Sequence, residues 1–150
     1  MQKLSIEQAV DQIVQADSRY HKEAYEFVRL ALDFTIKRIK KTAAGKERHV
    51  SGRELLEGVR DFALQEYGPL SCTVLNYWGL KRCEDIGEVV FNMVNINLLK
   101  TTEQDSREDF RNGYDFTDAF QRPFEPDIET RPESRRGRNT TATELGSAKS

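Results

Sequence analysis

The sequence predicts a mainly helical single domain of about five helices, with a small C-terminal β-hairpin or aromatic arm and a winged-helix-like order of elements. Two observations support this prediction. Apolar residues recur at intervals of three and four over most of residues 6–96, and capping residues and glycines divide that pattern into segments. A chain of 150 residues, of which 37% are hydrophobic, has the size and apolar content of one domain with one core.

The domain is expected to cover residues 1–124, because residues 125–150 lack the side chains that form a core. This C-terminal segment contains no aromatic residue, and its only large aliphatic residues are Ile128 and Leu145. Burying so little apolar surface cannot compensate for the conformational entropy that is lost on ordering. The sequence therefore predicts a disordered tail over residues 125–150.

The first two helices follow from capping signals and apolar spacing. Ser5, with Gln8 three residues later, forms a capping box, and the apolar residues that follow predict a helix over residues 6–16. Asp17 or Ser18 can cap a second helix, which should end near position 43. Its last turns are rich in basic residues, which the helix dipole favours at this end.

The remaining helices are separated by glycine and proline. Ser51 and Glu54 form another capping box and start a third helix, which Gly68 and the proline after it should end. A short fourth helix over residues 69–78 leads to a fifth, which extends to about position 96. Apolar residues cover most of the circumference of the fifth helix, so we expect it to lie at the centre.

An aromatic and acidic segment, residues 105–124, follows the fifth helix and is called the arm below. It contains five of the fourteen aromatic residues, interleaved with carboxylates. Burying five rings yields about 8–15 kcal/mol, whereas ordering about 20 residues costs on the order of 20–40 kcal/mol of backbone entropy. Asn112 and Gly113 are the pair favoured in two-residue hairpin turns. We therefore expect a hairpin that hydrogen bonds and rings clamp against the fifth helix, with its acidic edge exposed.

Three separated blocks of sequence resemble a known family. The blocks are HVSGRELLEGVRDFALQEYGPLSCTVLNYWGL (49–80), RCEDIGEVVFNMV (82–94) and LLKTTEQDSREDFRNGYDFTDAF (98–120). In their order and motifs, V-S-G-x-E-L-L-E-G-x-R, W-G, C-x-D-x-G-x-V-V-F-N, D-S-x-x-D-F and Y-D-F, they resemble conserved uncharacterised proteins found largely in Planctomycetes and Verrucomicrobia. The resemblance covers residues 20–124; it implies one compact domain and no particular activity.

Signals for metals and cofactors are weak. The four soft metal-ligand candidates lack the two-to-four-residue spacing of a zinc knuckle: Cys72, Cys83, His21 and His49. We expect the two cysteines to fill gaps in the core, and we expect no cofactor. The acidic residues of the arm invite a calcium or magnesium interpretation, but they lack the residue order of a calcium-binding loop. Solvated helix caps explain them more simply.

The cysteine content and the absence of a secretory signal predict a cytoplasmic protein. No apolar run approaches the length of about 20 residues that crosses a bilayer, so no membrane partner is expected. The sequence does not indicate an oligomeric state.

The charge pattern suggests two kinds of partner. The arm predicts a noncatalytic protein-protein interaction or regulatory module, which binds another protein through these residues: Asp105, Asp109, Phe110, Tyr114, Phe116 and Phe120. The alternative is a winged-helix-like nucleic-acid-binding regulator that contacts phosphates through its basic segment: Lys37, Arg38, Lys40 and Lys41. The acidic start of the fifth helix, Glu84 and Asp85, opposes this alternative. A metal-dependent enzyme is the third and least favoured hypothesis.

Overall fold

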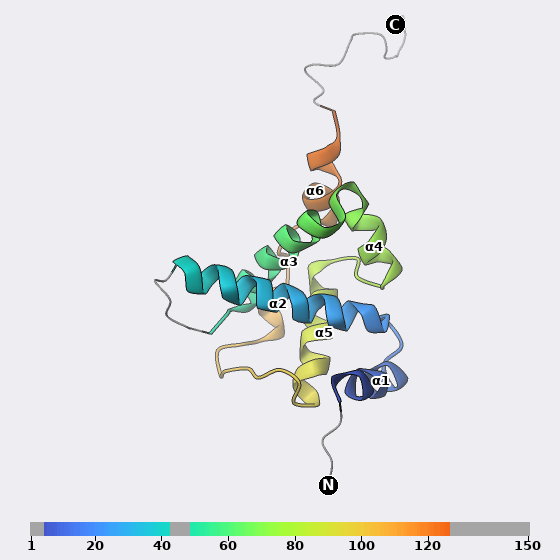
Figure 1. Cartoon of the computed structure of the whole chain (residues 1–150), viewed down its shortest axis with the longest axis vertical. Helices are drawn as coiled ribbons and strands as arrows, with labels where there is room; N and C mark the ends of the chain where they lie inside the picture. Colours follow the sequence, from blue (N-terminus) through green and yellow to red (C-terminus); the bar gives the residue numbers. More distant parts are fainter. Residues whose placement is uncertain (1–4, 43–48, 127–150) are drawn as a thin grey trace, which may run out of the picture.

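The computed structural model describes residues 5–42 and 49–126, and this part of the chain is mainly helical, as predicted. Figure 1 shows helix α2 crossing in front of helix α5, with α1 at one end of the molecule and α4 and α6 toward the other. The helices with seven or more residues are α1 (Ile6–Ala16), α2 (Lys22–Thr42), α3 (Gly52–Tyr67), α4 (Ser71–Tyr77) and α5 (Cys83–Asn95). The shorter ones are η1 (Gly68–Leu70), η2 (Arg107–Phe110), α6 (Phe116–Phe120) and η3 (Arg122–Phe124).

Helices α1 and α3 begin where the capping boxes placed them. The side chain of Ser5 accepts a hydrogen bond from the N–H of Gln8, and the side chain of Gln8 accepts one from the N–H of Ser5. Ser51 and Glu54 make the same reciprocal pair at the start of α3. Both capping predictions are confirmed, because each box satisfies N–H groups that the helix itself leaves without a partner.

Helix α2 begins at Lys22, later than predicted, because Asp17 binds other groups. Its carboxylate accepts hydrogen bonds from the guanidinium of Arg19 at 2.7 Å and from the amide of Asn92 on α5 at 3.1 Å. These hydrogen bonds, with Arg19 contributing most, hold the pKa of Asp17 well below its usual range although partial burial opposes them. Asp17 therefore ties the α1–α2 connection to the central helix.

Helices α2 and α3 approach closely at Gly58. A Cβ atom on Gly58 would lie only 1.7 Å from the Oγ1 of Thr35, which is buried and donates its hydroxyl to the carbonyl of Ala31 at 2.7 Å. A larger residue at position 58 would push the two helices apart. The absence of a side chain at Gly58 therefore allows α2 and α3 to pack closely.

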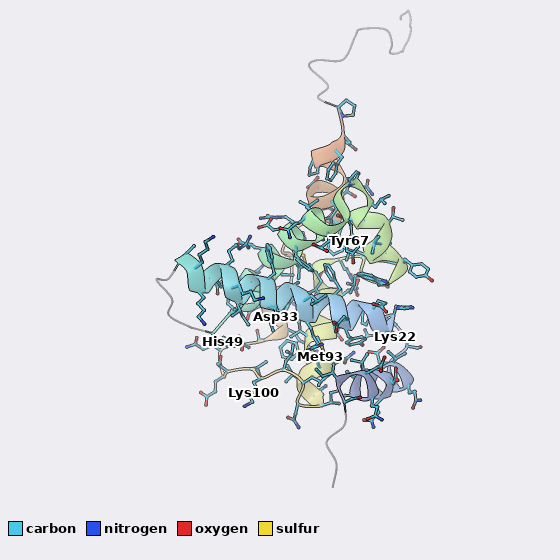
Figure 2. All side chains as sticks on the ribbon, viewed as in Figure 1. Lys22, Asp33, His49, Tyr67, Met93 and Lys100 are labelled. Carbon is cyan, nitrogen blue, oxygen red and sulfur yellow. The ribbon has the colours of Figure 1, made fainter. Side chains whose placement is uncertain are left out.

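Helix α5 packs against α1, α2, α3 and the short helix η2. Five of its side chains are buried along one side of the helix, and none of residues 83–94 is fully exposed: Cys83, Ile86, Val89, Val90 and Met93 are the buried five. Figure 2 shows Met93 in the middle of the molecule, close to where α2 crosses. The prediction that the fifth helix is central is confirmed.

The β-hairpin predicted at Asn112 and Gly113 is wrong, and residues 105–126 contain no strand. A type I′ turn needs positive φ at both positions, whereas only Asn112, with a φ of 52°, is left-handed. Gly113 instead lies on the core, where an added Cβ would come within 2.9 Å of the Sγ of Cys83. That sulfur accepts the N–H of Tyr114 at 3.4 Å, so a thiol takes the hydrogen bond that a strand would have taken. The winged-helix-like order therefore has no wing in this segment.

A short helix, α6, follows Asp115. The carboxylate of Asp115 accepts hydrogen bonds from the N–H groups of Thr117, at 2.8 Å, and Asp118, at 3.2 Å. Figure 1 shows α6 beside α3 and α4, and both helices contact it. The predicted tail falls almost entirely on residues 127–150, which lie outside the described residues, so the domain boundary at residue 124 stays a prediction.

Candidate functional site

The first half of the arm, residues 105–110, is held against the helices by one ring. Phe110 is 4% exposed and lies between two glycines, Gly52 at the start of α3 and Gly87 on α5. A Cβ on Gly87 would come within 2.8 Å of the Cβ and Cγ of Phe110, and one on Gly52 within 3.1 Å of its ring. The ring also meets Phe91 edge-on, with centroids 6.2 Å apart. The two glycines therefore create the space into which the arm docks.

The second half of the arm, residues 111–124, completes the core between α3 and α4. Phe116 and Phe120 are buried, and their ring centroids lie 5.0 Å apart. Tyr114 lies 6.0 Å from each of them and donates its hydroxyl to the carbonyl of Leu56 at 2.7 Å. Burial raises the pKa of Tyr114, because the phenolate would be removed from water. Three packed rings and one partly buried hydrogen bond therefore hold residues 114–120 against the helices.

A pocket of about 380 Å³ lies beside the first half of the arm, and we call it the arm pocket. Three helices and the arm supply its apolar walls: Leu32, Ile36, Val50, Leu55, Val90, Phe91, Val94, Leu99 and Phe110. Its volume falls in the range of about 300–1,000 Å³ that is typical of small-molecule sites. A concave apolar site with a few polar groups at one side is the arrangement expected of a ligand-binding pocket.

The polar side of the arm pocket is built around Asp105. Its side chain is 13% exposed, and its carboxylate accepts hydrogen bonds from the Nε2 of His49 at 2.7 Å and from the N–H of Thr102 at 2.8 Å. Asp109, Lys100 and Thr101 also line this side. His49 precedes α3 in the chain, and Lys100 lies on the loop after α5. Figure 2 shows both residues below α2 in that view. The His49–Asp105 pair therefore joins the loop after α5 to the residues that lead into α3.

The structure divides the six residues predicted to bind a partner into two groups. Asp105, Asp109 and Phe110 come together in the lining of the arm pocket. Tyr114, Phe116 and Phe120 lie in the second half of the arm, where Phe116 is 6% exposed and Phe120 is fully buried. Buried rings cannot form the contact surface of a partner without unfolding. The exposed charged side chains of the arm are three acids and three bases: Glu108, Asp115, Asp118, Arg107, Arg111 and Arg122. Glu108 and Asp118 form ion pairs with Arg111 and Arg122, so the exposed edge of the arm is charged but not mainly acidic.

The basic residues predicted to contact nucleic acid lie on the last turns of α2. Lys37, Lys40 and Lys41 are exposed. Arg38 is half-buried; its guanidinium donates to the carboxylate of Asp61 on α3 at 2.6 Å and lies 5.2 Å from the ring centroid of Phe34. Arg38 therefore fastens α2 to α3, and the rest of the basic segment, residues 43–48, lies outside the described residues.

The soft metal-ligand candidates are not gathered into one site. Cys72 and Cys83 are buried free thiols, as expected of residues that fill core gaps. Burial raises the pKa of Cys83, so the sulfur stays a neutral thiol that exchanges hydrogen bonds with the backbone of Tyr114. Within residues 5–42 and 49–126, no three His, Cys, Asp or Glu side chains are close enough together to hold a metal ion. His49 and Asp105 form a pair that could move a proton, but none of the described residues that line the arm pocket is a cysteine or a serine.

Sequence reasoning missed most of the residues that form the arm pocket. His49 was considered only as a metal ligand, and Leu32, Val94 and Lys100 were not considered as site residues. His49 and Asp105 are 56 positions apart, so no local pattern links them. The one available signal was the run from Leu99 to Thr101, where an apolar residue is followed directly by polar ones.

Comparisons with known proteins do not identify a family for this chain. No helix in residues 5–42 and 49–126 has the length and apolar character required to cross a membrane. A scan against protein-family models, a search of curated proteins and a search of solved structures find no match to this chain. The resemblance to the planctomycete and verrucomicrobial family therefore stays a prediction.

Proposed function

We propose that this protein is a noncatalytic regulatory module that binds a small, mainly apolar ligand in the arm pocket. The observation that carries the proposal is the pocket itself, an apolar cavity of about 380 Å³ with its polar groups confined to one side. The pocket is partly open to solvent, so a ligand can enter it without unfolding the domain.

The arm connects ligand binding to the surface of the molecule. Asp105, Asp109 and Phe110 line the pocket, while Glu108, between them in sequence, is exposed to solvent. A ligand that binds only the folded arm stabilises it by mass action, since the unfolded arm offers no pocket. We infer that ligand occupancy fixes the position of the exposed charged edge of the arm, which includes Glu108 and Asp118 and which a partner protein then contacts. This is the regulatory part of the proposal.

The ligand proposal is tested by filling the pocket. In the Leu32→Trp variant the indole should occupy the cavity, so binding of the neutral fluorescent probe phenylnaphthylamine should weaken by about tenfold or more. The matched control is Leu30→Trp, on the same helix, because Leu30 is 46% exposed and does not line the pocket. Fluorescence titration gives the affinities, and circular dichroism shows whether each variant is folded.

A second filling variant protects the test against misfolding. Val94→Phe fills the pocket from α5 rather than from α2. Equal probe affinity in the wild type, in Leu30→Trp and in whichever filling variants fold would contradict the proposal. No binding of the probe to the wild type would contradict it too.

Partner binding through the exposed charged edge of the arm, at Glu108 and Asp118, is tested separately. Reversing the exposed charges with Glu108→Lys and Asp118→Lys should remove a specific partner from pull-downs, because rim charges steer association. Glu7→Lys, on the exposed side of α1, is the control. The two arm substitutions are combined in one double variant. Identical sets of captured partners for the wild type, the double variant and Glu7→Lys would contradict the proposal that a partner binds the arm.

Location in the cytoplasm and nucleic-acid binding are further proposals. The buried free thiols Cys72 and Cys83 support a reducing compartment.

Nucleic-acid binding through Lys37, Lys40 and Lys41 is the alternative function, and the exposure of these side chains on α2 supports it. This alternative predicts that the protein shifts nucleic acid in gels and that the shift weakens steeply as the salt concentration rises. The absence of a shift at low salt would contradict the nucleic-acid-binding alternative.

A further inference from the structure

We propose that the ligand of the arm pocket carries a protonated amine on an apolar body, and that the carboxylate of Asp109 binds the amine. This inference rests on the proposed function and adds the chemical class of the ligand. It follows from the apolar walls, from the hydrogen bonds already made by Asp105 and from the position of Asp109.

The walls of the pocket select the body of the ligand. The lining is aliphatic on the α2 and α3 sides, with Leu32, Ile36 and Leu55, and aromatic where Phe91 and Phe110 meet. Such a lining stabilises a compact aromatic or branched aliphatic group, because it offers no hydrogen-bond partner to a polar one. The polar part of the ligand must therefore point toward the side that contains Asp105 and Asp109.

The two carboxylates on that side differ in how many hydrogen bonds they accept from the protein. Asp105 accepts the Nε2 of His49 and the N–H of Thr102 at 2.7 and 2.8 Å, and so it holds the loop in place. Asp109 accepts one long bond from the N–H of Ser106 at 3.4 Å. Among residues 5–42 and 49–126, no lysine or arginine makes an ion pair with Asp109. Asp109 is therefore the group with the capacity to accept a strong donor.

Asp109 is also placed where its charge has most effect. It is half-buried and lines the apolar pocket directly, so a charge pair formed there is screened less by salt than one on the surface. The backbone of Asp109 is fixed by the close packing of its Cβ atom against Gly52. A protonated amine can donate to this carboxylate while its apolar body fills the cavity.

The competing possibility is a carboxylate ligand paired with Lys100. Lys100 lines the same side of the pocket, but its side chain is exposed to solvent. Exposed pairs of this kind contribute little, since both ions keep most of their hydration and the long lysine side chain loses freedom. A ligand carboxylate would in addition be repelled by Asp105 and Asp109. The charges that line the pocket thus favour an amine over an acid.

The test compares three ligands with the same body: phenylbutylamine, phenylbutanol and phenylbutyrate. Isothermal titration calorimetry with the full chain at neutral pH gives their affinities. The amine should bind about tenfold more tightly than the alcohol, and the acid most weakly. Equal affinities of the three, or tightest binding of the acid, would overturn the inference while leaving the proposed function standing.

Two matched variants assign the effect to Asp109. Asp109→Asn should bring the amine down to the affinity of the alcohol, and it keeps an oxygen that can accept the N–H of Ser106. Glu108→Gln removes the same charge from the neighbouring, exposed position and should leave the preference unchanged. An amine preference that survives in Asp109→Asn, or that disappears equally in Glu108→Gln, would overturn the assignment. Failure of all three ligands to bind the wild type would overturn both the inference and the proposed function.

Discussion

The two halves of the arm share one sequence pattern, aromatic residues interleaved with acids, but they pack differently. In the second half, the rings of Tyr114, Phe116 and Phe120 pack together with centroids 5.0–6.0 Å apart. In the first half, one ring, Phe110, occupies the gap between two glycines, and the arm pocket lies beside it. The difference indicates that the second half is built for stability, whereas the first half leaves room for a ligand.

Hydrogen bonds follow the same division. The second half is fastened by the buried bond from Tyr114 to the carbonyl of Leu56, which water does not reach easily. The first half is fastened at the surface by the His49–Asp105 pair, in which the histidine side chain is 42% exposed. A surface pair of this kind contributes little to stability. We therefore expect the first half to open at lower free-energy cost than the second.

The largest expected effect comes from Phe120→Ala in the second half. Phe120 is fully buried, so the variant should lower the free energy of unfolding by about 3–5 kcal/mol. Phe110→Ala in the first half should cost less, because the ring already borders an open pocket, but it should weaken binding of phenylnaphthylamine. Urea denaturation measures both losses. A larger loss for Phe110→Ala than for Phe120→Ala would contradict the comparison.

The next effect comes from Gly87→Ala, which fills the space that Phe110 uses. The added methyl group would lie 2.8 Å from Phe110, so we expect a loss of about 1–3 kcal/mol in stability. The double variant Gly87→Ala with Phe110→Ala should recover part of that loss, because the colliding ring is gone. Strict additivity of the two losses in denaturation experiments would show that the ring does not depend on this glycine.

The smallest effect concerns Tyr114 and alkaline pH. Tyr114→Phe should cost about 1 kcal/mol at neutral pH through loss of the hydrogen bond to Leu56. Because burial raises the pKa of Tyr114 in the folded state, its stabilising effect is complete below the pKa of the unfolded chain, about 10. It is lost as the pH rises above that value, where only the unfolded state ionises. Stability curves from pH 8 to 11 should therefore fall less steeply for Tyr114→Phe, and parallel curves would argue against a buried phenol.

Much of the helical fold could be predicted because its signals are local. The Ser5 and Ser51 boxes set the starts of α1 and α3, and both depend only on residues three positions apart. The hairpin prediction failed because its signal was local while the outcome was not. Contacts with Leu56 and Cys83, far along the chain, hold Gly113 on the core and give Tyr114 a sulfur acceptor.

The candidate site could be predicted only in part, for the same reason. Asp105, Asp109 and Phe110 were expected to bind a partner because of their residue types, and all three line the arm pocket. The cavity itself depends on how α2, α3 and α5 are spaced around Phe110, which the periodicity of a single helix does not encode. Nor does the sequence reveal that the neighbour of Gly87 is Phe110, 23 positions later in the chain.

Hydrogen exchange of the arm, measured with and without phenylbutylamine, tests the central claim most directly. In the free protein the amides of residues 114–120 should exchange slowly, and those of residues 105–110 should exchange faster. The amine should slow residues 105–110 and leave residues 114–120 unchanged, since only the first half lines the pocket. Equal protection of both halves in the free protein, or slowing confined to the second half on ligand addition, would contradict the account.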